Sequence, residues 1–119
     1  MQQKDANMHL RQGDATASII HLHGELSAIP DEFLMNIHMQ TNPVKNNTII
    51  MNGSELESMN SCGINQIIQL LINTRRQQQR LLIFGLSEHN RYILEITRLN
   101  HFIDILETET QAIEAVHRF

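Results

Sequence analysis

The sequence has few of the residues from which disulfides, thiolate metal sites and base-stacking surfaces are built. Its 119 residues include one cysteine, Cys62, no tryptophan and only 4% aromatic residues. A single cysteine excludes an internal disulfide and a zinc site built from several cysteines. So few aromatic residues offer no stacking platform, and the net charge of −4 disfavours a nucleic-acid partner. We therefore expect a protein partner or a small ligand, and no metal or other cofactor.

Long hydrophobic runs are lacking as well. The longest apolar stretches, such as residues 48–51 and residues 67–72 with Gln69 inside, fall far short of the roughly 18 residues that a membrane span needs. Residues 1–7 are polar and carry charges of both signs, unlike a secretory signal. With 41% hydrophobic residues the chain can still build one core. We expect a single cytoplasmic domain over 1–119, with a flexible polar start at 1–7 and no insertion into a membrane.

Strand and helix signals alternate along the chain. Strands are predicted, from apolar alternation or β-branched runs, over residues 8–11, 17–22, 48–51, 80–84 and 102–106. Helices are predicted from Pro30 to a stop at Asn42 and Pro43, over residues 62–78, after Ser87 and after Thr108. This alternation predicts an α/β fold with a four- to five-stranded, mixed, mostly parallel sheet covered by about four helices.

Local patterns predict which side of these elements is buried. The strongest helical period is formed by Ile64, Ile67, Ile68, Leu71 and Ile72. In the second strand, Ile20 and Leu22 face one way and the histidines beside them the other, which predicts one buried and one polar face. Thr108, with Gln111 three residues later, is a capping-box pattern at the start of the last helix.

A loop of small and acidic residues leads into the most regular helix. Residues 52–60 form this predicted loop, which follows the strand at 48–51 and delivers Ser61 to the helix start. A helix start presents unpaired N–H groups and a partial positive charge, so it accommodates a phosphate. Gly63 has no Cβ, which predicts that the first turn is open to another chain. From spacing alone, the simpler interpretation of Ser61 is a helix N-cap.

Three short motifs occur in a characteristic order. Residues 22–26 read Leu-His-Gly-Glu-Leu, residues 59–63 read Met-Asn-Ser-Cys-Gly, and residues 96–99 read Ile-Thr-Arg-Leu. They resemble the Leu-x-Gly-Glu-Leu, Met-Asp-Ser-Ser-Gly and Leu-Thr-Gly-Leu segments of STAS domains, most closely those of the bacterial anti-sigma factor antagonists. The resemblance spans about residues 17–116, which is nearly the whole predicted domain.

The resemblance implies a protein that is bound and modified rather than a catalyst. In that family the unphosphorylated antagonist binds an anti-sigma factor with kinase activity, which phosphorylates the first serine of the motif, here Ser61, and a phosphatase restores binding. Phosphorylation adds roughly −1.5 to −2 charge, which breaks a protein contact without refolding the domain. The residues expected to form the partner-binding surface are Glu25, Ser27, Met59, Asn60, Cys62 and Gly63. Weak self-association is compatible with this hypothesis.

Three departures from the family pattern keep two alternatives open. Asn60 and Ser27 stand where the family often has aspartate, and Cys62 stands where serine or alanine is common. The lost negative charge at Asn60 favours a STAS scaffold that is not phosphorylated, such as a subunit of a transporter or signalling assembly. The second alternative is a thiol-dependent enzyme or redox sensor at Cys62, because a helix start makes a thiol more reactive. A small buried side chain is the simpler interpretation of that cysteine.

The remaining polar residues have structural explanations that suffice. His21 and His23 share one strand face, but no third metal ligand has helpful spacing. Arg75, Arg76 and Arg80 lie near the end of the long helix, where cations complement the negative end of the dipole. A contact between these arginines and an acidic partner stays open.

Overall fold

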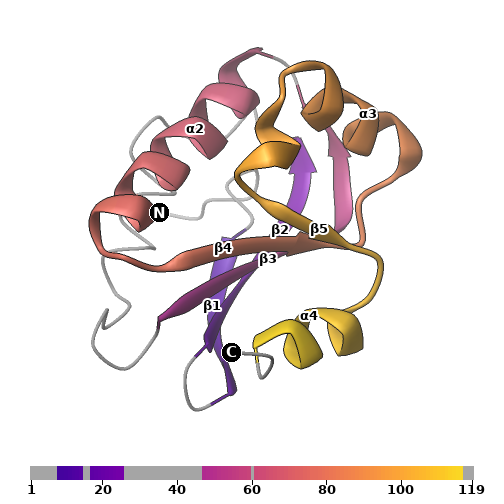
Figure 1. Cartoon of the computed structure of the whole chain (residues 1–119). Coiled ribbons are helices and arrows are strands. Elements are labelled where there is room, and N and C mark those ends of the chain that lie inside the picture. The colour runs from indigo at the N-terminus through magenta and orange to yellow at the C-terminus, as the bar shows by residue number, and fades with distance from the viewer. Residues whose placement is uncertain (1–7, 15–16, 26–46, 60, 117–119) are drawn as a thin grey trace, which may run out of the picture.

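A five-stranded sheet separates two layers of helices (Figure 1). The computed structural model describes residues 8–14, 17–25, 47–59 and 61–116. The strands are β1 (Met8–Asp14), β2 (Ala17–Glu25), β3 (Thr48–Ser58), β4 (Arg80–Phe84) and β5 (Asp104–Leu106). The helices are α2 (Ser61–Arg76), α3 (Glu88–Ile96), the 3₁₀ turn η2 (Leu99–His101) and α4 (Glu109–Val116). The helix expected from Pro30 lies outside the described residues.

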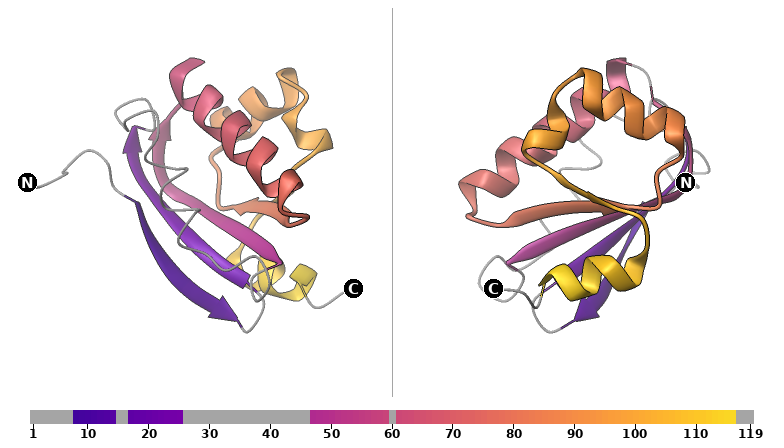
Figure 2. Two further views of the ribbon diagram at one scale, coloured as in Figure 1. Left: turned by 90° about the vertical axis from the view of Figure 1, so that its left-hand side faces the viewer. Right: turned by 45° about the vertical axis from the view of Figure 1, so that its right-hand side comes forward.

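The strands lie side by side in the order in which they occur in the chain. β1 is antiparallel to β2, whereas β2, β3, β4 and β5 run parallel to one another. A parallel pair requires a crossover, and α2 and then α3 with η2 supply two of them. Both crossovers cover the same face of the sheet, and α4 covers the other (Figure 2). The predicted α/β fold with a mixed, mostly parallel sheet is confirmed.

Each face of the sheet has its own hydrophobic cluster. The larger cluster, beneath α2 and α3, includes Ile20, Leu22, Ile49, Met51, Ile67, Leu70, Ile83 and Leu94. The smaller cluster, against α4, consists of Ala17, Ile19, Ile50, Leu82, Phe84 and Ala112. The start of β3 contributes to both clusters, which confirms a strand buried on both faces. The predicted polar face of β2 is wrong over its first half, because the smaller cluster covers Ala17 and Ile19.

The strand β3 is much longer than its apolar run. Residues 52–58, predicted as a loop, continue the strand to Ser58 because they pair with β2. Their small and polar side chains give no strand signal, since the hydrogen bonds that hold them come from a segment distant in the chain. The loop prediction is therefore wrong for residues 52–58.

The buried side of α2 is rotated from the predicted one. Ile67, Leu70 and Thr74 are 0% exposed, whereas Ile72 is 45% exposed. Ile64 and Ile68 are half-buried at the margin of the larger cluster. The run of isoleucine and leucine from 67 to 72 fits more than one helical face, and packing on the sheet selects the face that contains Leu70.

The third helix begins where the sequence predicts. Ser87 caps α3, because its Oγ accepts a hydrogen bond from the backbone N–H of Asn90 at 3.2 Å. The helix buries Asn90 and Leu94. The strand predicted at 102–106 is shorter than expected, since η2 and a turn precede β5 and leave Phe102 54% exposed.

The last helix has the predicted Thr108 cap, but the side chain of Gln111 reaches back to Glu107 instead of to Thr108, so the capping box is only partly formed. The backbone N–H of Gln111 donates to Thr108 Oγ1 at 3.1 Å, and Gln111 Oε1 accepts from the N–H of Glu107 at 2.9 Å. Replacing Thr108 by alanine is expected to lower the free energy of unfolding by about 1 kcal/mol, because the N–H of Gln111 loses its acceptor. Urea denaturation measures the loss. The control Thr110→Ala lies two residues on, inside the exposed first turn, and should be neutral or slightly stabilising.

Candidate functional site

The carboxyl end of β3 extends beyond its neighbour β4. β3 pairs with β4 from Thr48 to Asn52, whereas its pairing with β2 continues to Ser58. Residues 53–58 therefore extend past the end of β4, and we call them the overhang. Within the described chain, only β2 pairs with this part of β3. The carboxyl ends of β2 and β3 lie at the same end of the sheet (Figure 1). The overhang stops three residues before Ser61, where α2 begins, so it carries the chain to the predicted site.

Two β-bulges shape this overhang. Between the pairs His21–Asn52 and His23–Glu55, β3 has one residue more than β2. A second extra residue of β3 precedes Ser58. Bulges bend a strand and increase its twist, which explains why the pairing with β4 ends where the first bulge begins.

The side chain of Asn52 closes the first bulge. Its Oδ1 accepts hydrogen bonds from the backbone N–H of Ser54 at 3.0 Å and from Ser54 Oγ at 2.6 Å. Because a backbone N–H can only donate, this contact fixes the orientation of the amide, and Nδ2 donates to His21 Nδ1 at 2.8 Å. Nδ1 of His21 is then unprotonated. Asn52 thus ties β2 to the bend in β3.

Replacing Asn52 by alanine is expected to lower the free energy of unfolding by about 1–3 kcal/mol, because His21 and Ser54 lose their partner. Urea denaturation checks this value. The control is Asn65→Ala, an exposed position on α2 where the change should stay within about 0.5 kcal/mol. Equal stability of the two variants would mean that the amide does not hold the bulge.

The start of α3 packs against the overhang. A Cβ at Gly53 would lie 2.7 Å from Leu86 Cδ2, so the glycine permits this close approach. The buried Asn90 donates from Nδ2 to the carbonyl oxygen of Leu56 at 3.4 Å. Sequence reasoning missed these contacts. The sequence feature that could have indicated them is the spacing of Ser87 and Asn90. With Ser87 as the helix N-cap, this spacing places Asn90 in the first turn of α3.

Ser61 is the first residue of α2, one residue earlier than the predicted helix start. The first turn of α2 contains no acidic residue, and its last turn contains Arg75 and Arg76. The positive end of the helix dipole is therefore not offset by a carboxylate within that turn. An added phosphate at such a helix start is stabilised by the dipole and the unpaired N–H groups.

The structure places two other predicted partner-binding residues near Ser61. Glu25 pairs in register with Ser58, three residues before Ser61, and Cys62 lies in the first turn of α2. Ser27 and Asn60 lie outside the described residues. Direct contact of these four residues with a partner stays a prediction.

The last two predicted partner-binding residues, Met59 and Gly63, are buried in the structure. Met59 is 6% exposed and belongs to the larger cluster, so it anchors the segment before α2. Contact of Met59 or Gly63 with a partner stays a prediction. A residue that is next to Ser61 in the sequence need not share the surface on which Ser61 lies. The chain passes from strand to helix at this point, so neighbouring side chains point in different directions.

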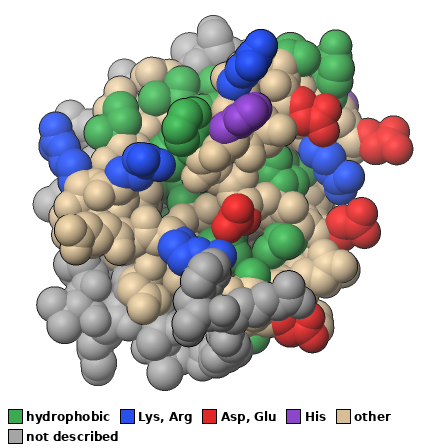
Figure 3. All heavy atoms as spheres, viewed as in Figure 1, with side chains coloured by type: hydrophobic (Ala, Val, Ile, Leu, Met, Phe, Trp, Pro, Cys, Tyr) green, Lys and Arg blue, Asp and Glu red, His purple; other side chains and the backbone are tan. Residues whose placement is uncertain are grey.

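The surface around these elements carries exposed acidic and apolar side chains. Glu55 and Glu57 are exposed on the overhang. The exposed large hydrophobic residues of the helical layer are Ile72, Tyr92, Ile96 and Phe102. The guanidinium of Arg75 lies 5.5 Å above the ring of Phe102, which joins α2 to the turn after η2. Figure 3 shows hydrophobic side chains on this face over α2 and α3.

Within the described ranges, no group of three or more His, Cys, Asp and Glu side chains is placed to hold a metal ion. His21, which the sequence paired with His23 as a possible ligand, is bonded to Asn52. No helix in the described part of the chain is both long and apolar enough to cross a membrane.

Solved structures with the same fold include several anti-sigma factor antagonists. TM1081 from Thermotoga maritima, assigned to that class, has a TM-score of 0.77 and 20% identity, over 93% of this chain and 95% of that one. The Bacillus protein SpoIIAA in its unphosphorylated form has a TM-score of 0.71 and 22% identity, over 94% and 97%. An antagonist from Mycobacterium paratuberculosis has a TM-score of 0.74 and 14% identity, over 98% of both chains. At these identities the likeness concerns the fold.

Comparison with proteins of curated function finds no match. The family model for the STAS domain, in contrast, matches residues 7–112. This range contains all five strands and the first half of α4, and it includes the three motifs on which the resemblance rests. The chain belongs to the STAS domain family.

Proposed function

We propose that this STAS domain is an anti-sigma factor antagonist that binds an anti-sigma factor with kinase activity and is released when that kinase phosphorylates Ser61. The observation that carries the proposal is the position of Ser61 at the start of α2, directly beyond the β3 overhang. The fold is shared with SpoIIAA, whose unphosphorylated and phosphorylated forms are both known. In this role the protein is a ligand and a kinase substrate in the cytoplasm and catalyses no reaction.

The helix start and the surrounding charge support a switch that leaves the fold intact. A phosphate on Ser61 would lie at the positive end of the α2 dipole, so the domain tolerates it. The same group adds roughly −1.5 to −2 charge beside an overhang on which Glu55 and Glu57 are already exposed. A partner that covers Ser61 would have to bury this charge, which opposes binding strongly unless the partner supplies a cation.

The exposed apolar residues of the helical layer support a protein as the partner. Ile72, Tyr92, Ile96 and Phe102 lie on α2, α3 and the turn after η2, which is the layer that contains the start of α2. Apolar and aromatic side chains form the anchors of protein interfaces. We place the anti-sigma factor on this layer, with Ser61 inside the contact.

Phosphorylation itself is tested by incubating the protein with ATP and an extract of the source cells, followed by mass spectrometry. Phosphate is expected on Ser61 and is expected to be removed by a phosphatase in the same extract. The exposed Ser54 and Ser87 serve as internal controls and should stay unmodified. Phosphate on a control serine with none on Ser61 would contradict the proposal.

A scaffold role is the second candidate, and Asn60 is the observation that favours it. Asn60 stands where the family has aspartate, so the negative charge beside the acceptor serine is lost. In that role the protein is a constitutive subunit of a transporter or signalling assembly, and its partner binds irrespective of the residue at position 61. The thiol-based alternative at Cys62 stays a prediction, and slow alkylation of Cys62 at neutral pH would count against it.

A further inference from the structure

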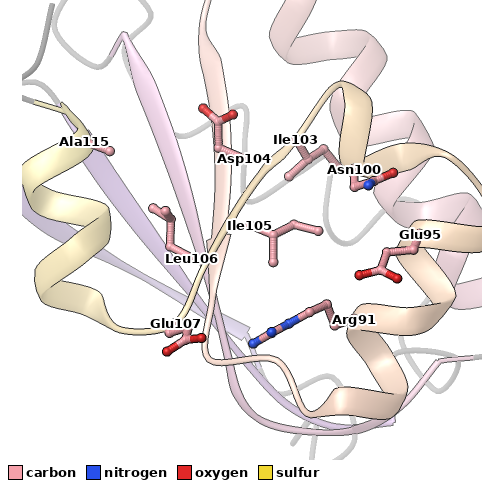
Figure 4. Close-up of a pocket in the computed structure, with 9 residues that line it drawn as sticks. All are labelled: Arg91, Glu95, Asn100, Ile103, Asp104, Ile105, Leu106, Glu107 and Ala115. Carbon is pink, nitrogen blue, oxygen red and sulfur yellow. The ribbon is translucent and has the colours of Figure 1, made fainter.

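A concave site lies on the side of the sheet that ends with β5. It is a cavity of about 440 Å³ between α3, β5, the residue Glu107 that follows β5, and the end of α4 (Figure 4). A volume of this size is typical of sites for small molecules. Its walls come from different elements: Arg91 and Glu95 from α3, Ile105 and Leu106 from β5, and Ala115 from α4. The lining side chains among the described residues come from positions 91–115, outside α2 and the β3 overhang.

The edge of β5 offers backbone hydrogen-bonding groups to the cavity. β5 is the last strand of the sheet, and the carbonyl of Leu106 accepts from the N–H of Gly85 at 3.3 Å, so Leu106 bonds toward β4. In a parallel pair, alternate residues direct their N–H and C=O groups to opposite edges. The N–H and C=O of Ile105 therefore point away from β4, toward the cavity that Ile105 lines. No described residue pairs with them.

Arg91 supplies a buried donor without an acceptor. Its Nε is buried and has no hydrogen-bond partner among the described residues. The side chain extends from α3 toward the side of the cavity where Glu107 lies (Figure 4). Because Nε is buried while the side chain as a whole is half-buried and lines the cavity, an occupant reaches the guanidinium through its other nitrogens, and a carboxylate is the acceptor that matches a guanidinium best. Arg91 therefore favours an occupant with an anionic oxygen group.

The carboxylates at the rim favour a cationic group on the same occupant. Glu95 lies four residues after Arg91 on α3, and Glu107 follows β5; both line the cavity and are exposed. A third carboxylate, Asp104, is already engaged, because Arg80 Nη2 lies 3.1 Å from its Oδ2 while Nη1 donates to Ala115 O at 3.0 Å. The two exposed glutamates leave the rim negative around the half-buried Arg91.

We propose that this cavity binds a small zwitterion of the α-amino-acid or short-peptide class. Its carboxylate accepts hydrogen bonds from Arg91, and its ammonium group lies near Glu95, on the α3 side of the cavity (Figure 4). An aliphatic side chain packs on the apolar wall formed by Ile103 and Ile105. A peptide unit in the ligand bonds with the exposed edge of Ile105, as an added strand would. This site is independent of the proposed switch at Ser61.

The test is an NMR titration of the ¹⁵N-labelled full chain with leucine and with the dipeptide Leu-Leu. We expect saturable shifts of the backbone amides of Ile105, Leu106 and Arg91. Replacing Arg91 by methionine should weaken binding about 10-fold or more, since a hydrogen bond to a charged group is lost. The matched control Arg76→Met, in the last turn of α2, should bind like the unmodified protein.

Blocked dipeptides separate the two charge contacts. N-acetyl-Leu-Leu lacks the ammonium group and Leu-Leu-amide lacks the carboxylate, so each should bind more weakly than Leu-Leu. Absence of saturable shifts at the cavity with leucine and Leu-Leu would overturn the proposal. Unchanged affinity in the Arg91→Met variant, or equal affinity of blocked and free dipeptides, would overturn it as well. None of these outcomes bears on phosphorylation of Ser61.

Discussion

Replacing Ser61 by aspartate is expected to weaken binding of the anti-sigma factor by about 100-fold, whereas Ser61→Ala should retain it. The aspartate puts a fixed negative charge at the start of α2, inside the proposed contact, and the partner then has to desolvate it. Alanine removes the phosphoacceptor without adding charge. The measurement is capture of partners from an extract of the source cells with the three proteins as baits, followed by calorimetric titration of the protein recovered.

A second charge variant controls for a general electrostatic effect. Thr108→Asp places the same charge at the start of α4, on the opposite face of the sheet, and aspartate is also a good N-cap. This variant should bind the partner like the unmodified protein. Equal binding by Ser61→Asp and Ser61→Ala would refute the switch. Retention of one transporter or scaffold component by all baits, with Ser61 unmodified, would establish the scaffold role instead.

The largest expected loss of stability comes from Leu82→Ala. Leu82 is 0% exposed in the middle of β4 and belongs to the smaller cluster, against which α4 packs. Removing its side chain leaves a cavity between the sheet and α4, and the free energy of unfolding should fall by about 2–5 kcal/mol. Urea denaturation followed by circular dichroism measures this loss.

Ile72→Ala is the matched control, since it also shortens an aliphatic side chain but at a position 45% exposed on α2. Its effect should stay below about 1 kcal/mol, because it removes less buried apolar area. A loss for Leu82→Ala as small as that of the control would mean that α4 closes over the void. The smaller cluster would then contribute little to the stability of the fold.

The parts of the fold that local patterns predict are those in which local and tertiary preferences agree. The run at 48–51 is β-branched and apolar, and it forms a strand buried on both faces. Ser87 and Thr108 cap the helices that follow them, because a cap depends on residues only three positions apart. Ser61 is the first residue of α2, one residue from the start that the helical period predicts.

The parts that local patterns miss depend on residues distant in the chain. The overhang at 53–58 is a strand because β2 pairs with it, and its polar residues cannot signal that pairing. Met59 is buried because the larger cluster extends beneath the start of α2. The cavity beside β5 is lined by residues between 91 and 115, which only the fold brings together. That Nε of Arg91 has no hydrogen-bond acceptor can therefore be recognised only in the structure.

The sequential order of the strands has a consequence for synthesis on the ribosome. Each described strand after β1 pairs with the described strand that left the ribosome before it, so it meets a partner that already exists. None of these five strands has to wait for a later one to be inserted beside it, and the sheet they form grows from one edge only. The edge that grows last is β5, so the wall of the cavity forms after the segment that presents Ser61. A ribosome-bound chain of this domain thus completes its proposed switch before its proposed ligand site.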